Sequence, residues 1–309
     1  MELEKNYIYQ VYLHGSFSKA AEALYITQPA LSIAIKKVEQ EIGADLFNRN
    51  SRPLTLTKIG QLYIEHIKQE LQLEQELKQR FDDLRDLQTG DLLIGGTHYM
   101  NAYVLPPYLA EFHQLYPNIN IEVSETSSDQ LIELLKEHKI DLTFSCDEEV
   151  LKKFDHVPAF EDDILFAVPR SCELPLELIE QSLSAQDIAS GRHLAEDCPT
   201  VDFSHFPDIN FILIDSHVNL GMRTLKIFEE ANLHPTIKIK VPQLVTSFLL
   251  AKAGVGATFT SDLLVEGTEE SLRFFKLTSQ YAHRQYYLLL PQCSYVPKTV
   301  KEFIKLLCE

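Results

Sequence analysis

Apolar residues recur every three or four positions through roughly the first ninety residues, which is the spacing of helices that bury one face. The first such run covers residues 3–13, and a second, shorter one covers residues 19–24. A third helix starts at Thr27, runs to about residue 41 and ends at Gly43, a residue suited to a helix C-terminus. Two short helices joined by a tight turn predict a helix-turn-helix.

The third helix has two distinct faces. One face is apolar at spacings of four, three and four, and it carries Leu31, Ile35, Val38 and Ile42. That stripe must pack inward, so the opposite face, with Ser32, Ile33 and Lys36, points outward. An outward face that is polar and basic is typical of a recognition helix in the major groove.

A turn-rich stretch follows the third helix. Residues 48–53 contain Arg49 and Arg52, and residues 54–56 then alternate like a short strand. The pattern predicts a β-wing beside the helix-turn-helix.

A long helix is predicted from about residue 58 to residue 87, capped by Thr57. Its apolar positions are Ile59, Tyr63, Ile67, Leu71, Leu73, Leu77, Phe81 and Leu84. We expect this stripe to pair with the same helix of a second copy, because a lone helix would expose it. The alternative is a solvated rod.

From Asp91 onward short apolar strands alternate with helices. Strands are expected over residues 92–96, 119–125, 140–145, 164–169, 211–215, 236–241, 272–277 and 285–290, and helices over 106–116, 129–138, 220–231, 243–252 and 297–307. Such alternation over about 220 residues predicts one or two doubly wound α/β sheets.

Net charge changes the picture only when it is divided by segment. The whole chain carries 28 basic and 45 acidic residues, a net charge of −17, which argues against nucleic acid as a partner. Residues 1–60 hold seven basic against six acidic residues, or +1, and residues 89–309 hold 17 against 32, or −15. The acidity therefore belongs to the C-terminal part, and the N-terminal part stays compatible with DNA.

The chain reads as a cytoplasmic protein. Its N-terminus has early acids rather than the basic region of a signal peptide, and no apolar stretch is long enough to cross a bilayer. Five cysteines, none paired at CxxC spacing, fit reduced thiols better than disulfides or a zinc site. We expect no metal, no other cofactor and no membrane partner.

Several stretches of the N-terminal residues match one known sequence pattern in register: Gly15-Ser16-Phe17-Ser18-Lys19-Ala20-Ala21, Leu24, Thr27-Gln28-Pro29-Ala30-Leu31-Ser32, Ile35-Lys36-Lys37-Val38-Glu39, Gly43-Ala44-Asp45-Leu46-Phe47-Asn48-Arg49, Leu56-Thr57 and Gly60. In these stretches the chain resembles the DNA-binding domain of LysR-type transcriptional regulators. A looser match to the family's effector domain includes Leu105-Pro106-Pro107, Tyr116-Pro117 and Ala253-Gly254-Val255-Gly256. The resemblance covers nearly the whole chain.

The resemblance implies a winged helix-turn-helix over residues 1–58, a dimerising linker helix over 59–88 and an effector-binding domain over 89–309. That domain would be two α/β subdomains like those of periplasmic binding proteins, the first about 89–165 with 266–309 and the second about 166–265. A small molecule in the cleft between them would alter DNA binding or bending. Double-stranded promoter DNA and other copies of the chain, as a dimer and then a tetramer, are the implied partners, and RNA polymerase is a further candidate.

The DNA-contact hypothesis concerns the outward face of the third helix and its basic surroundings. The candidates are Lys19, Thr27, Gln28, Pro29, Ala30, Ser32, Ile33, Lys36, Arg49 and Arg52. The family often has a basic or polar residue where this chain has Ile33, which can touch a thymine methyl group but cannot hydrogen-bond a base edge. The alternative reading is a solvated basic face.

The effector-contact hypothesis concerns the carboxyl ends of strands, where open α/β sheets bind ligands. The candidates are Thr97, His98, Tyr99, Met100, Thr126, Ser127, Ser128, Cys146, His217, Val218 and Thr246. Several precede a helix, where free N–H groups suit an anionic ligand. Thr126, Ser128 and Thr246 could instead be helix caps, and His98 and His217 could be ordinary surface groups.

Three other functions fit the sequence less well. A redox-sensing regulator of the same family would use effector-domain cysteines, but Cys198 follows Glu196-Asp197, which would raise its pKa and lower its reactivity. A solute-binding or transport protein would need only the α/β part, so this function does not account for the first ninety or so residues. An enzyme is not expected, because the chain has no GxSxG, P-loop, HExxH or GxGxxG after a strand. Residues 170–210 form a longer connection than the family's usual one, as a lid or an interface.

Overall fold

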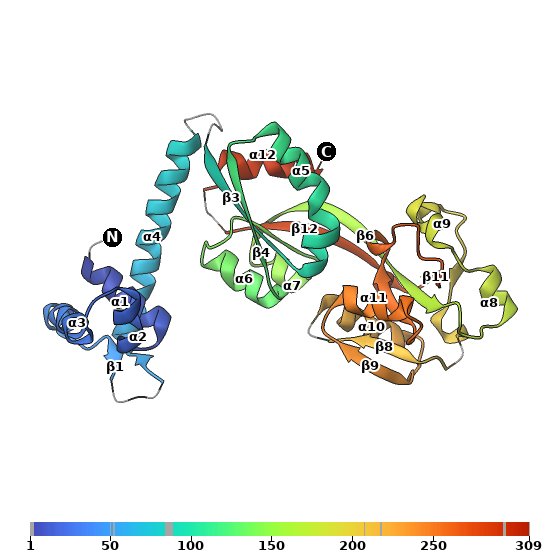
Figure 1. Cartoon of the computed structure of the whole chain (residues 1–309), viewed down its shortest axis with the longest axis horizontal. Helices are drawn as coiled ribbons and strands as arrows, with labels where there is room; N and C mark the ends of the chain where they lie inside the picture. The colour runs from blue at the N-terminus through green and yellow to red at the C-terminus, as the bar shows by residue number, and fades with distance from the viewer. Residues whose placement is uncertain are drawn as a thin grey trace. The chain divides into compact units, whose positions relative to one another are not determined.

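The computed structural model describes residues 3–49, 51, 53–83, 89–206, 208–216, 218–292 and 295–308. The chain divides into two compact units, Met1–Leu84 and Arg85–Glu309. Figure 1 labels most of the helices and strands of both units.

The N-terminal unit is a winged helix-turn-helix followed by a long helix. Its elements are α1 (Leu3–His14), α2 (Phe17–Ala23), α3 (Gln28–Ile42), β1 (Phe47–Asn48), β2 (Thr55–Leu56) and α4 (Lys58–Asp83). β1 and β2 pair antiparallel and form the predicted wing. Gly43 ends α3 with a positive φ of 78°, which a glycine adopts without strain.

One apolar cluster holds this unit together. The predicted inner stripe of α3 is buried at Leu31, Ile35 and Val38, whereas Ile42, in the last turn, is exposed. Ile64 and Ile67 of α4 pack into the same cluster. Each Å² of buried apolar surface stabilises the fold by about 25 cal/mol, so burial of this stripe is the main interaction that orients α3.

The effector unit has two lobes that share one long strand. β6 (Asp155–Pro169) pairs with β12 (His283–Leu290) through Asp163, and from Ile164 it pairs with β10 (Thr258–Ser261) and, over Leu165–Pro169, with β11 (Leu272–Leu277). β6 therefore leaves one sheet and enters the other between two consecutive residues. Figure 1 shows β6 and β12 crossing from one lobe toward the other.

The first lobe contains the N-terminal strands of the unit. β3 (Gly90–Gly96) pairs in parallel with β4 (Ile119–Glu125), and an Ile94–Leu142 bridge connects β3 to β5 (Thr143–Ser145), which pairs with β12. α5 (Leu105–Leu115) and α12 (Lys298–Cys308) cover one face of the sheet, where Phe112 meets Phe303 edge to face. α6 (Ser128–Lys136) and the short α7 (Glu148–Leu151) lie at the other (Figure 1).

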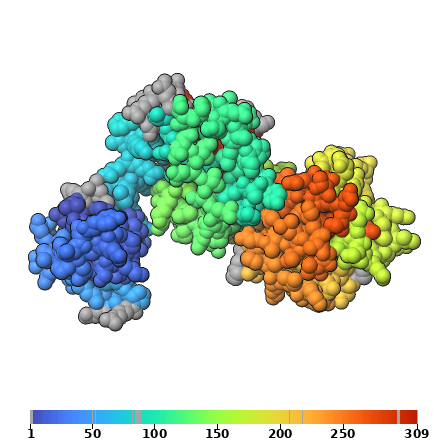
Figure 2. All heavy atoms as spheres, in the orientation of Figure 1, coloured from blue at the N-terminus to red at the C-terminus, as the bar shows by residue number. Residues whose placement is uncertain are grey.

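The second lobe repeats this plan. β8 (Phe211–Ile214) pairs in parallel with β9 (Ile237–Val241). A further parallel bridge joins Phe211 of β8 to Ala257, the residue just before β10. α10 (Asn219–Glu230) and α11 (Leu244–Lys252) pack on β8, and buried phenylalanines, among them Phe166, Phe211 and Phe259, fill the core. In the space-filling view the green first lobe and the orange second lobe meet along a narrow waist (Figure 2).

Two features differ from the sequence expectations. β6 begins nine residues before the predicted strand over 164–169. β11 pairs within the second lobe, so the chain returns to the first lobe after Leu277 rather than at residue 266. The longer connection over residues 170–210 packs on the edge of the second sheet, where β7 (Thr200–Val201) pairs with β11. Among its described residues none lines the cavity between the lobes, which does not favour a lid.

Candidate functional site

The outer face of α3 presents the residues expected to meet DNA. Thr27 is the N-cap, and its hydroxyl accepts a hydrogen bond from the N–H of Ala30 at 3.4 Å. The exposed residues on and before the first turns are Thr27, Gln28, Pro29, Ala30, Ile33 and Lys36. Ser32 is half-buried, and Ile33 is 71% exposed, so an apolar side chain stands out on this polar face.

Arg49 makes three contacts with side chains of its own unit. Its Nη2 donates to Glu39 Oε2 at 2.7 Å, its Nη1 donates to Ser32 Oγ at 3.1 Å, and its guanidinium lies 5.1 Å from the centre of the Phe17 ring. Glu39 is buried and also accepts from the N–H of Leu46. Arg49 therefore joins α3 to the first strand of the wing, a structural role that its position in the sequence did not reveal.

The remaining basic candidates differ in how much charge they can offer to a phosphate. Lys36 is exposed, and within the described part of the chain no carboxylate pairs with it, whereas Lys37 lies 4.0 Å from Glu41. Lys19 is exposed on α2. Arg52 lies outside the described residues.

The long helix α4 leaves an apolar stripe uncovered within its own unit. Tyr63, Ile67 and Leu71 pack on the N-terminal core, and Leu84 lies outside the described residues. Large apolar side chains that are exposed along the helix are Ile59, Leu62, Leu73, Leu77 and Phe81.

A cavity of about 410 Å³ opens between the two lobes of the effector unit. Its first wall comes from the carboxyl ends of β3 and β5 and the starts of α6 and α7, and its second wall comes from the starts of α10 and α11. Both walls therefore follow the rule that ligands of such sheets approach the carboxyl ends of strands. The volume lies within the range of small-molecule sites.

Most of the expected effector contacts line this cavity. They are Thr97, His98, Tyr99, Met100, Thr126, Ser127, Ser128, Cys146 and Val218. Thr246 is exposed on α11 outside the lining, and His217 lies outside the described residues. At the start of α6 the cap is Ser127, whose hydroxyl accepts from the N–H of Gln130, while the Thr126 hydroxyl donates to the Gln130 side chain.

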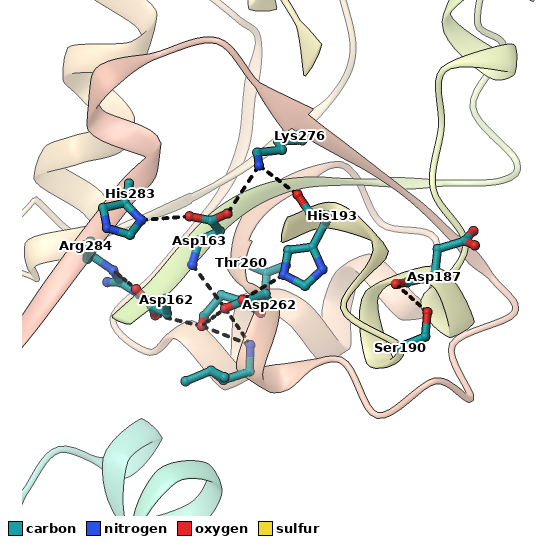
Figure 3. Close-up of polar contacts among 12 residues, drawn as sticks. Asp162, Asp163, Asp187, Ser190, His193, Thr260, Asp262, Lys276, His283 and Arg284 are labelled. Carbon is teal, nitrogen blue, oxygen red and sulfur yellow. Dashed lines mark hydrogen bonds and ion pairs between the residues drawn. The ribbon is translucent and has the colours of Figure 1, made fainter. Parts of the chain in front are cut away.

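The floor of the cavity holds residues that sequence reasoning missed. Arg284 and Tyr286, both buried on β12, line it, and Arg284 forms a buried ion pair with Asp162 of β6. Arg284 Nε donates to Asp162 Oδ1 at 2.7 Å, and Nη2 donates to Oδ2 (Figure 3). Residues 122 positions apart in the chain give no local signal of such a pair.

Asp162 also joins the lobes through two hydroxyl groups. The hydroxyl of Tyr99, in the first lobe, donates to Asp162 Oδ2 at 3.0 Å, and the hydroxyl of Ser261, on β10 of the second lobe, donates to the same oxygen at 2.7 Å. Tyr99 and Ser261 lie 2.8 Å apart. The carboxylate is thus satisfied where β6 passes between the sheets.

This network perturbs the acidity of its neighbours. Burial, with the negative charge of Asp162, raises the pKa of Tyr99 far above its ordinary value. Burial also raises the pKa of the Cys146 thiol, although Arg284 and Arg223 act in the opposite direction. Both groups are therefore neutral near pH 7 and face the cavity as hydrogen-bonding groups rather than as anions.

A second polar cluster lies beside the first (Figure 3). His193, from the 170–210 connection, is buried and its Nε2 lies 2.9 Å from Asp262 Oδ2. Lys276 donates to the His193 carbonyl at 2.7 Å, and His283 Nδ1 lies 2.9 Å from Asp163 Oδ1. The connection is thereby fastened to the point where the shared strand changes sheets.

Comparison with known proteins identifies the chain. Residues 85–309 match the model of the LysR substrate binding domain, and residues 6–61 match that of the bacterial regulatory helix-turn-helix protein, lysR family. The chain belongs to the LysR family. The predicted fold class, an N-terminal winged helix-turn-helix with an α/β effector part, is confirmed.

Individual relatives are transcriptional regulators. The chain is 26% identical to an uncharacterized HTH-type transcriptional regulator, YcgK, of Bacillus subtilis, over 97% of this chain and 91% of that one. It is 32% identical to a probable RuBisCO transcriptional regulator of Cyanidioschyzon merolae, over 52% of this chain and 54% of the other.

Solved structures share the fold. The LysR family regulator CbnR superposes with a TM-score of 0.62 at 17% identity, covering 100% of this chain and 98% of CbnR. CbnR has also been solved in complex with its target DNA. Full-length BenM gives a TM-score of 0.53 at 23% identity, with 99% and 96% covered. Within the described residues, no helix is both long and apolar enough to cross a membrane.

Proposed function

We propose that this LysR-family chain is a cytoplasmic regulator that responds to a small molecule. Its N-terminal unit binds promoter DNA, and a ligand in the cavity of its effector unit alters DNA binding or bending. The observation that carries the proposal is that one chain combines an exposed recognition-helix face with a cavity of about 410 Å³ between two lobes. No step requires catalysis or a cofactor.

The proposed DNA contacts divide by chemistry. Gln28 can pair with adenine in the major groove, and Pro29, Ala30 and Ile33 can touch thymine methyl groups. Lys36 and Lys19 are suited to phosphates, and Arg52 to the backbone or minor groove. Thr27 and Ser32 complete the set with hydroxyl groups. Arg49 contributes charge at the edge of the groove, but its pairing with Glu39 makes its main effect indirect.

We propose that the regulator works as a dimer through α4 and as a tetramer built from two such dimers. The apolar side chains exposed along α4 support a helix–helix interface. A net charge of only +1 over residues 1–60 gives one copy little attraction for DNA, so several copies of Lys36 on one site would be needed for tight binding. RNA polymerase is a proposed further partner.

Redox sensing is not favoured by the described cysteines. Burial raises the pKa of the thiols of Cys146, Cys172, Cys198 and Cys308, and at Cys198 it outweighs the opposing positive charges of Lys276 and Arg192. A reactive sensor thiol needs a lowered pKa. Alkylation of the full-length protein should therefore leave its DNA affinity unchanged, and a loss of DNA affinity on alkylation would revive the redox alternative.

The test of the regulator proposal is DNA binding by the full-length protein. Fluorescence anisotropy should show tighter binding to DNA from upstream of its own gene than to a scrambled duplex. Lys36→Ala should weaken binding and reduce the slope of log K against log salt by about 0.9 for each lost phosphate contact.

Lys37→Ala is the matched control, since Lys37 is the next residue on α3 and lies near Glu41. It should change the slope less than Lys36→Ala does. Equal slopes for wild type and Lys36→Ala would remove Lys36 from the phosphate contacts. Failure to bind any of a panel of genomic fragments would overturn the proposal.

A further inference from the structure

The two walls of the cavity differ at their helix N-termini. On the first wall, α6 starts with Ser127, whose hydroxyl caps it, and it carries Asp129 in its first turn. α7 starts with Asp147, whose carboxylate accepts from the N–H of Glu149 at 2.8 Å. Carboxylates at helix N-termini offset the positive end of the helix dipole, so this wall is poorly suited to an anionic group.

The second wall has the opposite arrangement at its helix ends. α10 and α11 start at N-cap residues Val218 and Gln243, neither of which makes a side-chain cap, and neither helix has an acid in its first turn. Both N-termini line the cavity. Asp215 also lines this wall and is an acidic residue. The positive potential of the wall therefore comes from the backbone N–H groups at the starts of the two helices.

The floor supplies two polar atoms on buried residues, Arg284 Nη1 and the Thr143 hydroxyl, that no described residue bonds. Arg284 is 2% exposed, and Asp162 occupies its Nε and Nη2, but no described residue accepts a hydrogen bond from Nη1. Thr143, on β5, is fully buried and its hydroxyl has no partner among the described residues. Both residues line the cavity. Buried polar groups of this kind normally have a partner, and the oxygens of a bound ligand would supply it.

We infer that the effector is a small zwitterion, a carboxylic acid that also carries an amine, of about the size of an amino acid. Its carboxylate faces Arg284, Thr143 and the N-termini of α10 and α11, and its ammonium group faces Asp129 and Asp147. The inference rests on the proposed effector-binding function and names the ligand class. A dicarboxylate of the same length would place its second negative charge against the acidic wall, which is unfavourable.

A ligand with opposite charges at its ends would also contact both lobes at once. Its binding energy would favour the arrangement in which the walls lie closest, because only that arrangement satisfies both charges. The polar network of Tyr99, Asp162 and Ser261 lies directly at the junction that such a movement would bend.

The inference is tested by calorimetry on the full-length protein with matched probes. The common amino acids are screened first by thermal shift, beside dicarboxylates of similar length. Each amino acid that binds is then compared with its α-hydroxy acid, which lacks the amine, and its amino alcohol, which lacks the carboxylate. We expect loss of either charged group to weaken binding at least about tenfold, the effect of one charge-assisted hydrogen bond.

Two variants assign the ends of the ligand. Asp129→Asn should weaken the amino acid but leave its α-hydroxy acid unaffected, and Thr143→Val, which keeps the side-chain shape, should weaken every probe that carries a carboxylate. Glu148→Gln is the matched control, because Glu148 follows Asp147 but does not line the cavity. It should leave all affinities unchanged.

The same samples are titrated onto promoter DNA, so that the two proposals fail separately. Equal or tighter binding of a dicarboxylate or an α-hydroxy acid would overturn the zwitterion while the regulator proposal stands. Absence of binding by every amino acid, with specific DNA binding intact, would overturn it too. If the wild-type protein shows no specific DNA binding, that result would instead refute the proposed function.

Discussion

Each unit of this LysR-family regulator contains an arginine–carboxylate pair that joins two separate elements, and the two pairs differ in burial. In the N-terminal unit, the side chains of Arg49 and Glu39 are 38% and 4% exposed. In the effector unit, those of Arg284 and Asp162 are 3% and 0% exposed. The chemistry is the same, so the comparison isolates what the surroundings do to it.

Burial changes what each pair needs. Water can solvate the Arg49 guanidinium if Glu39 is lost, which limits the cost of breaking the pair. Water cannot reach Asp162, so its negative charge depends on Arg284, Tyr99 and Ser261. The second pair is therefore expected to be costly to break, even though forming it from solvated ions yields little net stability.

Arg284→Met should produce the largest effect. It leaves Asp162 buried and without its cation, which costs about 3–5 kcal/mol in other proteins. Urea denaturation of the full-length protein, followed by far-UV circular dichroism, should show a midpoint well below that of the wild type.

The double variant Arg284→Met/Asp162→Leu separates the loss of the pair from the isolation of its carboxylate. It removes both charges and leaves the 2.8 Å contact between Tyr99 and Ser261 available, so much of the lost stability should return. A double variant as unstable as the single one would show that the pair itself stabilises the effector unit.

Arg49→Ala should have a smaller effect on stability. Glu39 stays buried but keeps the N–H of Leu46 as a hydrogen-bond partner, and only the Arg49 end of the pair is open to water, so we expect a loss of about 2 kcal/mol. Hydrogen exchange measured by mass spectrometry would place the loss in α3 and the wing. Lys19→Ala, at an exposed residue of the same unit, is the control and should stay within about 0.5 kcal/mol of wild type. Equal losses at Arg49 and Arg284 would break the link between burial and cost.

The local features of both units could be predicted from the sequence. The stripe of α3, the glycine that ends it and the wing follow from local spacing, and the structure contains all three. Most of the cavity lining follows from the rule that ligands approach strand ends. Those features depend on residues that are neighbours in the chain or on a general property of the sheet.

The pairs themselves depend on tertiary contacts that local spacing does not reveal. The first half of β6 contains Pro158 and the adjacent acids Asp162-Asp163, which favour a loop when the strand partners are unknown. Its pairing with β12 buries Asp162 and brings Arg284 to it. The sequence predicts Arg49 as a DNA contact, which stays a prediction, but it gives no sign that Arg49 also pairs with Glu39.

A capping box in the 170–210 connection extends the comparison to a more exposed carboxylate. Asp187 accepts hydrogen bonds from the hydroxyl and the N–H of Ser184, at 2.6 and 2.8 Å, at the start of α9 (Ala185–Ala189). These bonds hold the pKa of Asp187 below its ordinary value of 3.8. Asp187→Ala should cost about 1 kcal/mol at pH 7, the usual value of a helix cap.

The pH dependence of that loss follows from the direction of the pKa shift. A lowered pKa in the folded state means that the carboxylate stabilises the protein above its unfolded pKa and ceases to do so as pH falls through the folded one. The difference in unfolding free energy between wild type and Asp187→Ala should thus be constant from pH 7 to pH 5 and shrink below about pH 4. Urea denaturation at several pH values measures it. A difference that persists unchanged into acid would mean that Asp187 acts through side-chain packing rather than through its charge, and burial alone would then no longer rank the three carboxylates.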